Sequence, residues 1–277
     1  MKYYYLPEKY QMLHSACFEL IGQIEEFIIS EDFIFLQTSV LSIDKEGLER
    51  FNENSDIWDF LKKHDEEQFY KQLNKNLLLG LLRDFCYFMQ ESLECSNKMR
   101  LVVAYALLRR PLVDNLKILL RILLDDRFYD NFINSDSYDP VSMKDDELKM
   151  LLKETNSIRL ANSITGEHIY HYIFEKANQG AIINLSNKAI HPVTTRPWNK
   201  TGEMNLNFMF TTSCDIDKLW HHYYTLLPAI LLFYSELFNM TIFTLFSDEV
   251  NKDLLSKRIE RTVEIMSSIF PLQQKGI

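Results

Sequence analysis

Apolar residues recur every three or four positions through nearly the whole chain, and this periodicity limits the fold more than any other feature of the sequence. The spacing places apolar side chains on one face of an α-helix, whereas a half-buried strand alternates apolar with polar residues. The 277 residues include only 7 Gly and 7 Pro, too few turn formers for a sandwich or barrel of many short strands. The sequence therefore predicts an all-α fold, a bundle of about nine helices.

The apolar pattern and the start and stop residues predict helices over 7–30, 56–63, 66–95, 98–126, 143–160, 166–178, 180–190, 215–246 and 248–269. Pro111 and Pro228 each interrupt a long apolar helix, where the ring removes a backbone hydrogen bond and predicts a kink. Ser142 and Asp215 are predicted N-caps, because their short side chains can accept a hydrogen bond from a first-turn N–H.

One segment, residues 203–212, breaks the helical period and alternates like a short strand-like hairpin or lid. It ends the loop 191–214, which we expect to be a mobile flap, because loops of more than about 12 to 15 residues are uncommon in compact domains. No Pro/Gly-rich linker divides the chain, so residues 1–277 are predicted to form a single helical domain. A subdivision into an N-terminal helical subdomain, 1–96, and a helical core, 97–277, stays open.

Several features favour a cytoplasmic protein. The four cysteines show no metal-binding spacing, which is typical of reduced thiols: Cys17, Cys86, Cys95 and Cys214. The opening residues MKYYYLPEKYQ lack the apolar run of a secretory signal. Leu226 to Phe246 has the length of a membrane span, but it contains Glu236, Asn239 and Pro228, so we expect a buried core helix and no membrane.

The charge is unevenly distributed along the chain. The net charge is −9, which argues against a general nucleic-acid coat protein, because such affinity comes chiefly from Lys and Arg. Residues 97–124 nevertheless carry six basic side chains and one acid, and residues 181–202 carry three basic side chains and no acid. This asymmetry predicts a local anion site within an acidic body.

Two helical stripes provide the candidate site residues. At about 100° per residue, Arg110, Asp114, Lys117 and Arg121 share one face of the first basic segment. In the second, Asn184, Asn187, Lys188 and His191 share a face, and Pro192 places His191 at the helix C-terminus, where the dipole favours a protonated imidazole. Each stripe could equally be a solvated face with local ion pairs and a capping histidine.

The strings ALLRRPLVDNLKILLRILLDDRF and NLSNKAIHP resemble a group of uncharacterised bacterial all-helical proteins. That group pairs an Arg-Pro-Leu helix with a later Ser-x-x-x-x-His element, and the likeness covers roughly residues 97–245. More distantly, the chain resembles the HEPN superfamily, many of whose members are metal-independent ribonucleases in toxin and phage-defence systems. The resemblance implies that Arg110 holds phosphate and His191 handles protons. Unlike the usual HEPN spacing of one or two helical turns, about eighty residues separate them here.

Other site chemistries find less support. His168, His171 and Glu175 share a helix face, but a catalytic metal site needs a further ligand, and no metal or cofactor is predicted. The chain lacks the GxxxxGK[ST], GxGxxG, GxSxG and HExxH motifs, so it has no signature of a P-loop ATPase, a Rossmann dehydrogenase, a serine hydrolase or a zincin.

Two functional hypotheses result. In the first, the protein is an RNA- or nucleotide-directed effector, a metal-independent ribonuclease in which Asp114 orients Arg110, and His191 is the general acid or base. The anion would be held by Lys117, Arg121, Ser186, Asn187, Lys188 and Arg196. In the second, the protein is a non-catalytic helical sensor or scaffold that pairs with a partner protein or a second copy. Only the first requires Arg110 and His191 to meet in one cleft.

The helix predicted over 215–246 is apolar around most of its circumference, so we expect neighbours on several sides and a role in dimer formation. Glu236 lies within that apolar surface. A buried carboxylate needs a cation or several donors, or else it stays protonated, and the basic helix over 97–124 is the expected source of a cation.

Overall fold

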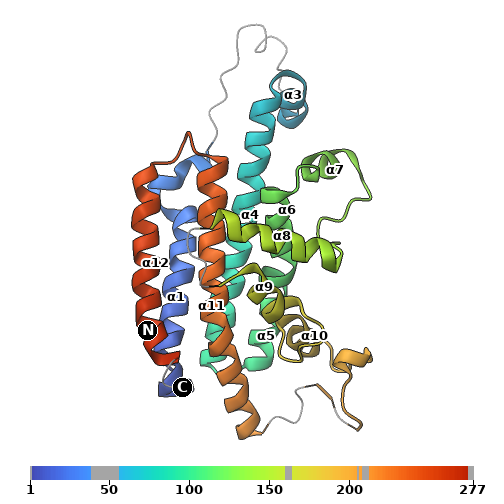
Figure 1. Cartoon of the computed structure of the whole chain (residues 1–277), viewed down its shortest axis with the longest axis vertical. Coiled ribbons are helices and arrows are strands. Elements are labelled where there is room, and N and C mark those ends of the chain that lie inside the picture. Colours follow the sequence, from blue (N-terminus) through green and yellow to red (C-terminus); the bar gives the residue numbers. More distant parts are fainter. Residues whose placement is uncertain (1, 39–55, 160–163, 205, 208–211, 274–277) are drawn as a thin grey trace.

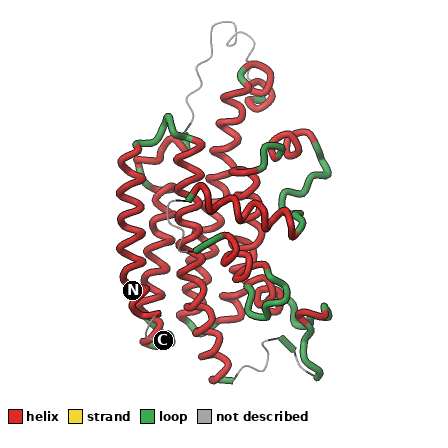
Figure 2. Tube along the Cα trace, viewed as in Figure 1, coloured by secondary structure: helices red, strands yellow, loops and turns green. Residues whose placement is uncertain are grey.

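The computed structural model describes residues 2–38, 56–159, 164–204, 206–207 and 212–273. All regular secondary structure in these ranges is helical, as predicted (Figure 2). The α-helices are α1 (Glu8–Ile29), α3 (Ile57–His64), α4 (Glu66–Asn97), α5 (Leu101–Arg109), α6 (Asn115–Leu124), α7 (Phe128–Asn134), α8 (Asp145–Ile158), α9 (Gly166–Ile169), α10 (Ile182–Ile190), α11 (Ser213–Leu245) and α12 (Lys252–Gln273). The described residues also contain two π segments, η2 (Arg110–Asp114) and η3 (Tyr170–Phe174), and two 3-10 segments, η1 (Glu31–Leu36) and η4 (Pro197–Asn199).

The helix boundaries follow local signals in the sequence. Asp56 and Asp65 cap α3 and α4 by accepting hydrogen bonds from first-turn backbone N–H groups. The N-cap of α11 is Thr212, and Asp215 is its reciprocal partner in a capping box, so Asp215 is not the cap itself. Lys144, not Ser142, precedes α8. Side-chain caps therefore set several helix starts, sometimes a few residues from the predicted position.

The number of helices differs from the prediction at two places. The segment predicted as one helix over 98–126 is divided into α5, η2 and α6 at Pro111. A short helix, α7, lies where none was predicted. α11 stays helical through Pro228. Half of the strand expected over 203–212, residues 205 and 208–211, lies outside the described residues, and the described half contains turns and no strand.

The helices pack as two groups that share α4. α1 packs against α4, α11 and α12, and these long helices run side by side in Figure 1. On the other side of α4, α5 packs against both α4 and α10, and α6 packs against α8. One continuous cluster of buried apolar side chains extends from α1 through α4, α5 and α6 to α11. The two basic segments are therefore brought together through the contact of α5 with α10.

α11 is the most enclosed long helix. By length and composition alone it could cross a membrane, but 78% of its most apolar stretch is buried within the protein. Its buried residues lie on several sides, as expected from the sequence, and include Tyr223, Tyr224, Phe233 and Phe238. α11 is therefore a core helix, and it packs against α1, α12 and α5.

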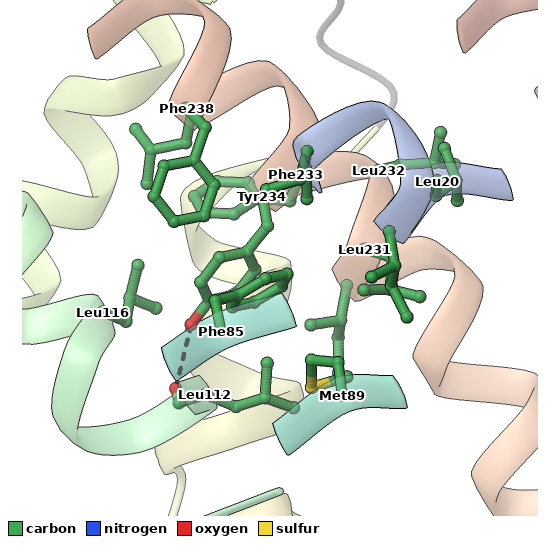
Figure 3. Packing of buried hydrophobic residues seen from close by; sticks show 14 of the residues in the cluster. Leu20, Phe85, Met89, Leu112, Leu116, Leu231, Leu232, Phe233, Tyr234 and Phe238 are labelled. Atoms are coloured by element: carbon green, nitrogen blue, oxygen red, sulfur yellow. Dashed lines mark hydrogen bonds between the residues drawn. The ribbon is translucent and has the colours of Figure 1, made fainter. Parts of the chain in front are cut away.

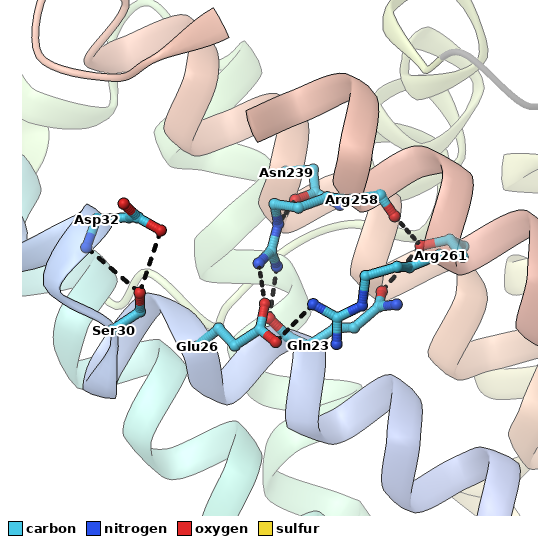
Figure 4. Close-up of polar contacts among 8 residues, drawn as sticks. Gln23, Glu26, Ser30, Asp32, Asn239, Arg258 and Arg261 are labelled. Atoms are coloured by element: carbon cyan, nitrogen blue, oxygen red, sulfur yellow. Dashed lines mark hydrogen bonds and ion pairs between the residues drawn. The ribbon is translucent and has the colours of Figure 1, made fainter. Parts of the chain in front are cut away.

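A buried arginine joins the C-terminal helix to this core. Arg258 of α12 donates to Oδ1 of Asn239 and to Glu26, each at 2.7 Å (Figure 4). Its guanidinium lies 4.0 Å from the ring centroid of Phe27. Burial lowers the pKa of Arg258 to about 10, so these partners offset part of the cost of keeping the charge inside. One side chain thus links α1, α11 and α12.

Candidate functional site

The turn of π-helix between α5 and α6 sets which arginine enters the candidate site. Pro111 has no N–H to donate, and its ring disturbs an α-helical turn. The backbone N–H of Asn115 donates to the carbonyl of Arg110, five residues back, as a π turn requires. The π turn holds one more residue than an α turn. Arg109, five residues before Asp114, therefore lies on the same face as Asp114, where regular α-helical spacing would place Arg110.

A buried hydroxyl supports this wide turn from α11. The Tyr234 hydroxyl donates to the carbonyl oxygens of Pro111 and Leu112, both at 3.2 Å. Figure 3 shows the bond to Leu112. The Tyr234 ring stacks on Phe85 of α4, with the centroids 4.7 Å apart. The long helix therefore satisfies carbonyl groups of the π turn, and it holds that turn against the core.

We expect Tyr234→Phe to destabilise the protein by about 1–2 kcal/mol, because the buried carbonyls of the π turn would lose their donor while the ring packing stays. Urea unfolding followed by far-UV circular dichroism measures this change. Tyr87→Phe is the matched control, since Tyr87 is 55% exposed and should show no loss. Equal stability of the two variants would contradict the support assigned to Tyr234.

Arg109 points from α5 toward α10. Its Nη1 donates to Oδ1 of Asn187, and its Nη2 lies 3.8 Å from the carboxylate of Asp114. The Arg109 side chain remains 31% exposed. An amide on one side and a loosely placed carboxylate on the other hold the guanidinium while leaving donors for a further acceptor.

An open cavity of about 440 Å³ adjoins this arginine. It is lined by Arg109, Ile183, Asn187, Ile190, His191, Val193, Thr194, Thr195 and Arg196. None of these lining residues, all within the described part of the chain, is an Asp or a Glu. The volume is that of a small-molecule site, and the charged side chains that line it, Arg109 and Arg196, are cationic.

His191 is the C-terminal cap of α10, as the following proline predicted. Its backbone N–H donates to the carbonyl of Asn187, and Nδ2 of Asn207 donates to its own carbonyl at 2.8 Å. The His191 backbone is thus held on both sides, while its side chain is exposed to the cavity. An imidazole in this position can exchange protons with a bound ligand.

The other predicted residues divide between the cavity and the rest of the helix. Asn187, His191 and Arg196 line the cavity, whereas Arg110 does not. Arg110 instead pairs with Asp84 of α4 and lies 5.6 Å from the ring centroid of Phe88, with its side chain 58% exposed. The expected pairing of Arg110 with Asp114 is therefore wrong, because the π turn rotates Arg110 toward α4.

The cations further along α6 are engaged elsewhere. Lys117 donates to the carbonyl of Val141 at 3.2 Å, and burial lowers its pKa. Arg121 is buried and donates to two backbone carbonyls and to acidic side chains: Pro140, Ser142, Asp125 and Glu147. These contacts hold α6 against the segment before α8. Lys117 and Arg121 were predicted to bind the ligand, but here they bond to the protein itself.

Two predicted residues of α10 lie outside the cavity lining. Ser186 is buried and donates to the carbonyl of Ile183 at 3.4 Å, so it faces the protein interior. Lys188 is half-buried. Of the stripe expected on this helix, Asn184 is also turned inward, donating to the carbonyls of Lys176 and Asn178.

The sequence interpretation missed Arg109, Thr194 and Thr195 as lining residues. The arginine was missed because a regular α-helical wheel places it off the stripe. Its signal was Pro111 two residues later, which marks the wide turn. The threonines carried no signal beyond an acid-free loop.

No group of three or more His, Cys, Asp or Glu side chains that could hold a metal occurs among the described residues. In the trio considered from the sequence, His171 pairs with Glu175, and His168 accepts through Nδ1 from the backbone N–H of Thr165. These side chains therefore serve local helix contacts.

Comparison of the chain with models of known protein families, with curated proteins and with solved structures gave no match. The function of the cavity must therefore be inferred from the residues that line it and from their arrangement.

Proposed function

We propose that the protein is an RNA- or nucleotide-directed effector whose cavity binds a phosphate ester. The residues of this cavity cleave RNA without a metal ion. The observation that carries this proposal is the cavity of about 440 Å³ in which Arg109, His191 and Arg196 meet without an acid in the lining. Arginine suits phosphate because its planar guanidinium donates paired, charge-assisted hydrogen bonds. The cavity therefore selects an anion of nucleotide size.

In the proposed reaction, Arg109 and Arg196 hold the phosphate and stabilise the charge that develops on its oxygens. His191 removes the proton from the ribose 2′-hydroxyl, and that oxygen forms a bond to the neighbouring phosphorus. The bond from phosphorus to the 5′-oxygen breaks, and water protonates the leaving oxygen. The products are a 2′,3′-cyclic phosphate end and a 5′-hydroxyl end. Asp114 is a positioning residue, since it contacts Arg109 and does not line the cavity.

The test is cleavage of single-stranded RNA by the purified protein in the presence of EDTA, with end-group analysis of the products. We expect His191→Ala to lower the cleavage rate by about a hundredfold or more, because it removes the general base. Arg109→Gln is expected to weaken binding and to slow cleavage. Arg110→Gln is the matched control, because the neighbouring arginine pairs with Asp84 away from the cavity, and it should cleave like the wild type.

The outcomes separate the two hypotheses raised by the sequence. Binding of RNA or nucleotide that depends on Arg109, with RNA left intact by the wild type, would support a non-catalytic sensor instead. Equal behaviour of Arg109→Gln and Arg110→Gln in binding would overturn the cavity as the site.

A further inference from the structure

A compact loop follows the cavity and presents an exposed tryptophan. Thr194 and Thr201 close this loop: the backbone N–H of Thr201 donates to the carbonyl of Thr194 at 2.9 Å, and the backbone N–H of Thr194 donates to the hydroxyl of Thr201 at 2.7 Å. Asn207 adds a third tie, because its backbone N–H donates to the carbonyl of Pro192 at 2.8 Å. The loop is therefore closed at its base by Thr194, which itself lines the cavity.

Trp198 lies within this closed loop, on the 3-10 turn η4. Its backbone carbonyl accepts a hydrogen bond from the side chain of Gln179, which belongs to the turn before α10. Its side chain nevertheless remains 39% exposed, whereas Trp220 of α11 is 5% exposed and donates to a buried carbonyl. The loop thus fixes the backbone of a large aromatic residue whose ring stays accessible.

Cations flank this tryptophan on the chain. Arg196, two residues before it, lines the cavity, and Lys200 follows two residues after it. Two residues span at most about 7 Å, so the backbone of Trp198 lies within that distance of Arg196, and Trp198 itself is not one of the residues that line the cavity. Sites for unpaired nucleotides combine cations for the backbone with an aromatic face for the base.

We propose that Trp198 is a stacking platform for a nucleobase, so that the cavity takes a nucleoside phosphate with an unpaired base and not a bare phosphate ester. This inference rests on the proposed function and names its ligand class. Free nucleotides and single-stranded RNA share that chemistry. A base held in a duplex does not, because both of its faces are covered by its neighbours.

The test compares adenosine 5′-monophosphate with ribose 5-phosphate, which carries a hydroxyl in place of the base, by isothermal titration calorimetry on the full chain. We expect the nucleotide to bind about tenfold more tightly, the effect typical of one stacked base. Trp198→Ala should remove this preference while leaving ribose 5-phosphate binding unchanged, and Trp198→Phe should keep most of it. Tyr87→Ala, an exposed aromatic on α4, is the control and should keep the full preference.

A second arm compares a single-stranded RNA of about eight nucleotides with its duplex, and measures Arg109→Gln with every ligand. If the single-stranded RNA binds more tightly than the monophosphate, the ligand of the cavity is RNA. If the monophosphate binds more tightly, the ligand is a free nucleotide. The inference is overturned if Trp198→Ala leaves the base preference intact, or if the duplex binds as well as the single strand. With either of these two outcomes, the proposed function still holds if Arg109→Gln weakens binding. If the wild type binds none of the ligands, or Arg109→Gln changes none of the affinities, the proposed function fails and the inference falls with it.

Discussion

Gly166→Ala is expected to destabilise the protein by about 3 kcal/mol, because the added methyl group would meet backbone and not a movable side chain. A Cβ built on Gly166 would lie 1.8 Å from the carbonyl oxygen of Leu152 and 2.4 Å from its carbon. The backbone N–H of Gly166 also donates to Oδ1 of Asn156 at 2.8 Å, which holds the start of α9 against α8. Relief of the clash would therefore have to move α9 away from α8 and break that bond.

Urea unfolding of Gly166→Ala and Gly80→Ala measures this effect against a matched glycine. Gly80 is exposed to solvent in the middle of α4, and a Cβ there would meet nothing within 4 Å. Gly80→Ala should leave the protein unchanged or more stable by up to about 1 kcal/mol, because alanine has the higher helix propensity. A Gly166→Ala variant as stable as Gly80→Ala would show that α9 does not pack on α8 in this way.

Arg159→Met is expected to destabilise the protein by about 3 kcal/mol at pH 8, because it leaves a carboxylate without its cation inside the protein. Arg159 is fully enclosed, its Nη1 lies 2.9 Å from Oε2 of Glu236, and its guanidinium lies 4.4 Å from the ring centroid of Phe233. It also donates to Oδ1 of Asn156 and to the carbonyl of Ile164. Methionine keeps the bulk of the side chain but loses all of these bonds.

The pH dependence follows from the carboxylate. Burial raises the pKa of Glu236 from 4.5 to about 7, although the charge and hydrogen bond of Arg159 lower it in part. A folded-state pKa above the unfolded one gives stability that is fully present below pH 4.5 and is lost as the pH rises toward 7. Without Arg159 the pKa of Glu236 rises further, so the deficit of Arg159→Met relative to wild type should be larger at pH 8 than at pH 5.

Unfolding of Arg159→Met and of Arg159→Met/Glu236→Leu at both pH values checks this account. Replacing both partners removes the unpaired charge, so the double variant should recover most of the stability lost at pH 8 and should lose the extra pH dependence. A deficit that is the same at pH 5 and pH 8 would mean that Glu236 is solvated in the variant, and that the pair contributes little.

The helices and their approximate ends were predictable because they depend on near neighbours in the chain. Apolar spacing marks each buried face, and Pro192 ends α10 at His191 through local steric conflict. The sequence predicted that Glu236 would meet a cation or several donors or would stay protonated, and it pairs with a cation. Its supplier was not predictable: the cation is Arg159, just after α8, and not a residue of the basic helix.

The candidate site shows the same division between local and tertiary information. The sequence by itself determined that cations gather in two segments and that His191 caps a helix. Only the tertiary structure decided that Arg109, not Arg110, enters the cavity. A proline signals a distortion, but the wide turn is supported by a hydroxyl from Tyr234, more than a hundred residues away. Likewise, Arg121 was expected to hold a ligand and instead holds backbone carbonyls. Periodicity reports which face a side chain occupies in a regular helix, whereas the partner it meets depends on packing between distant segments.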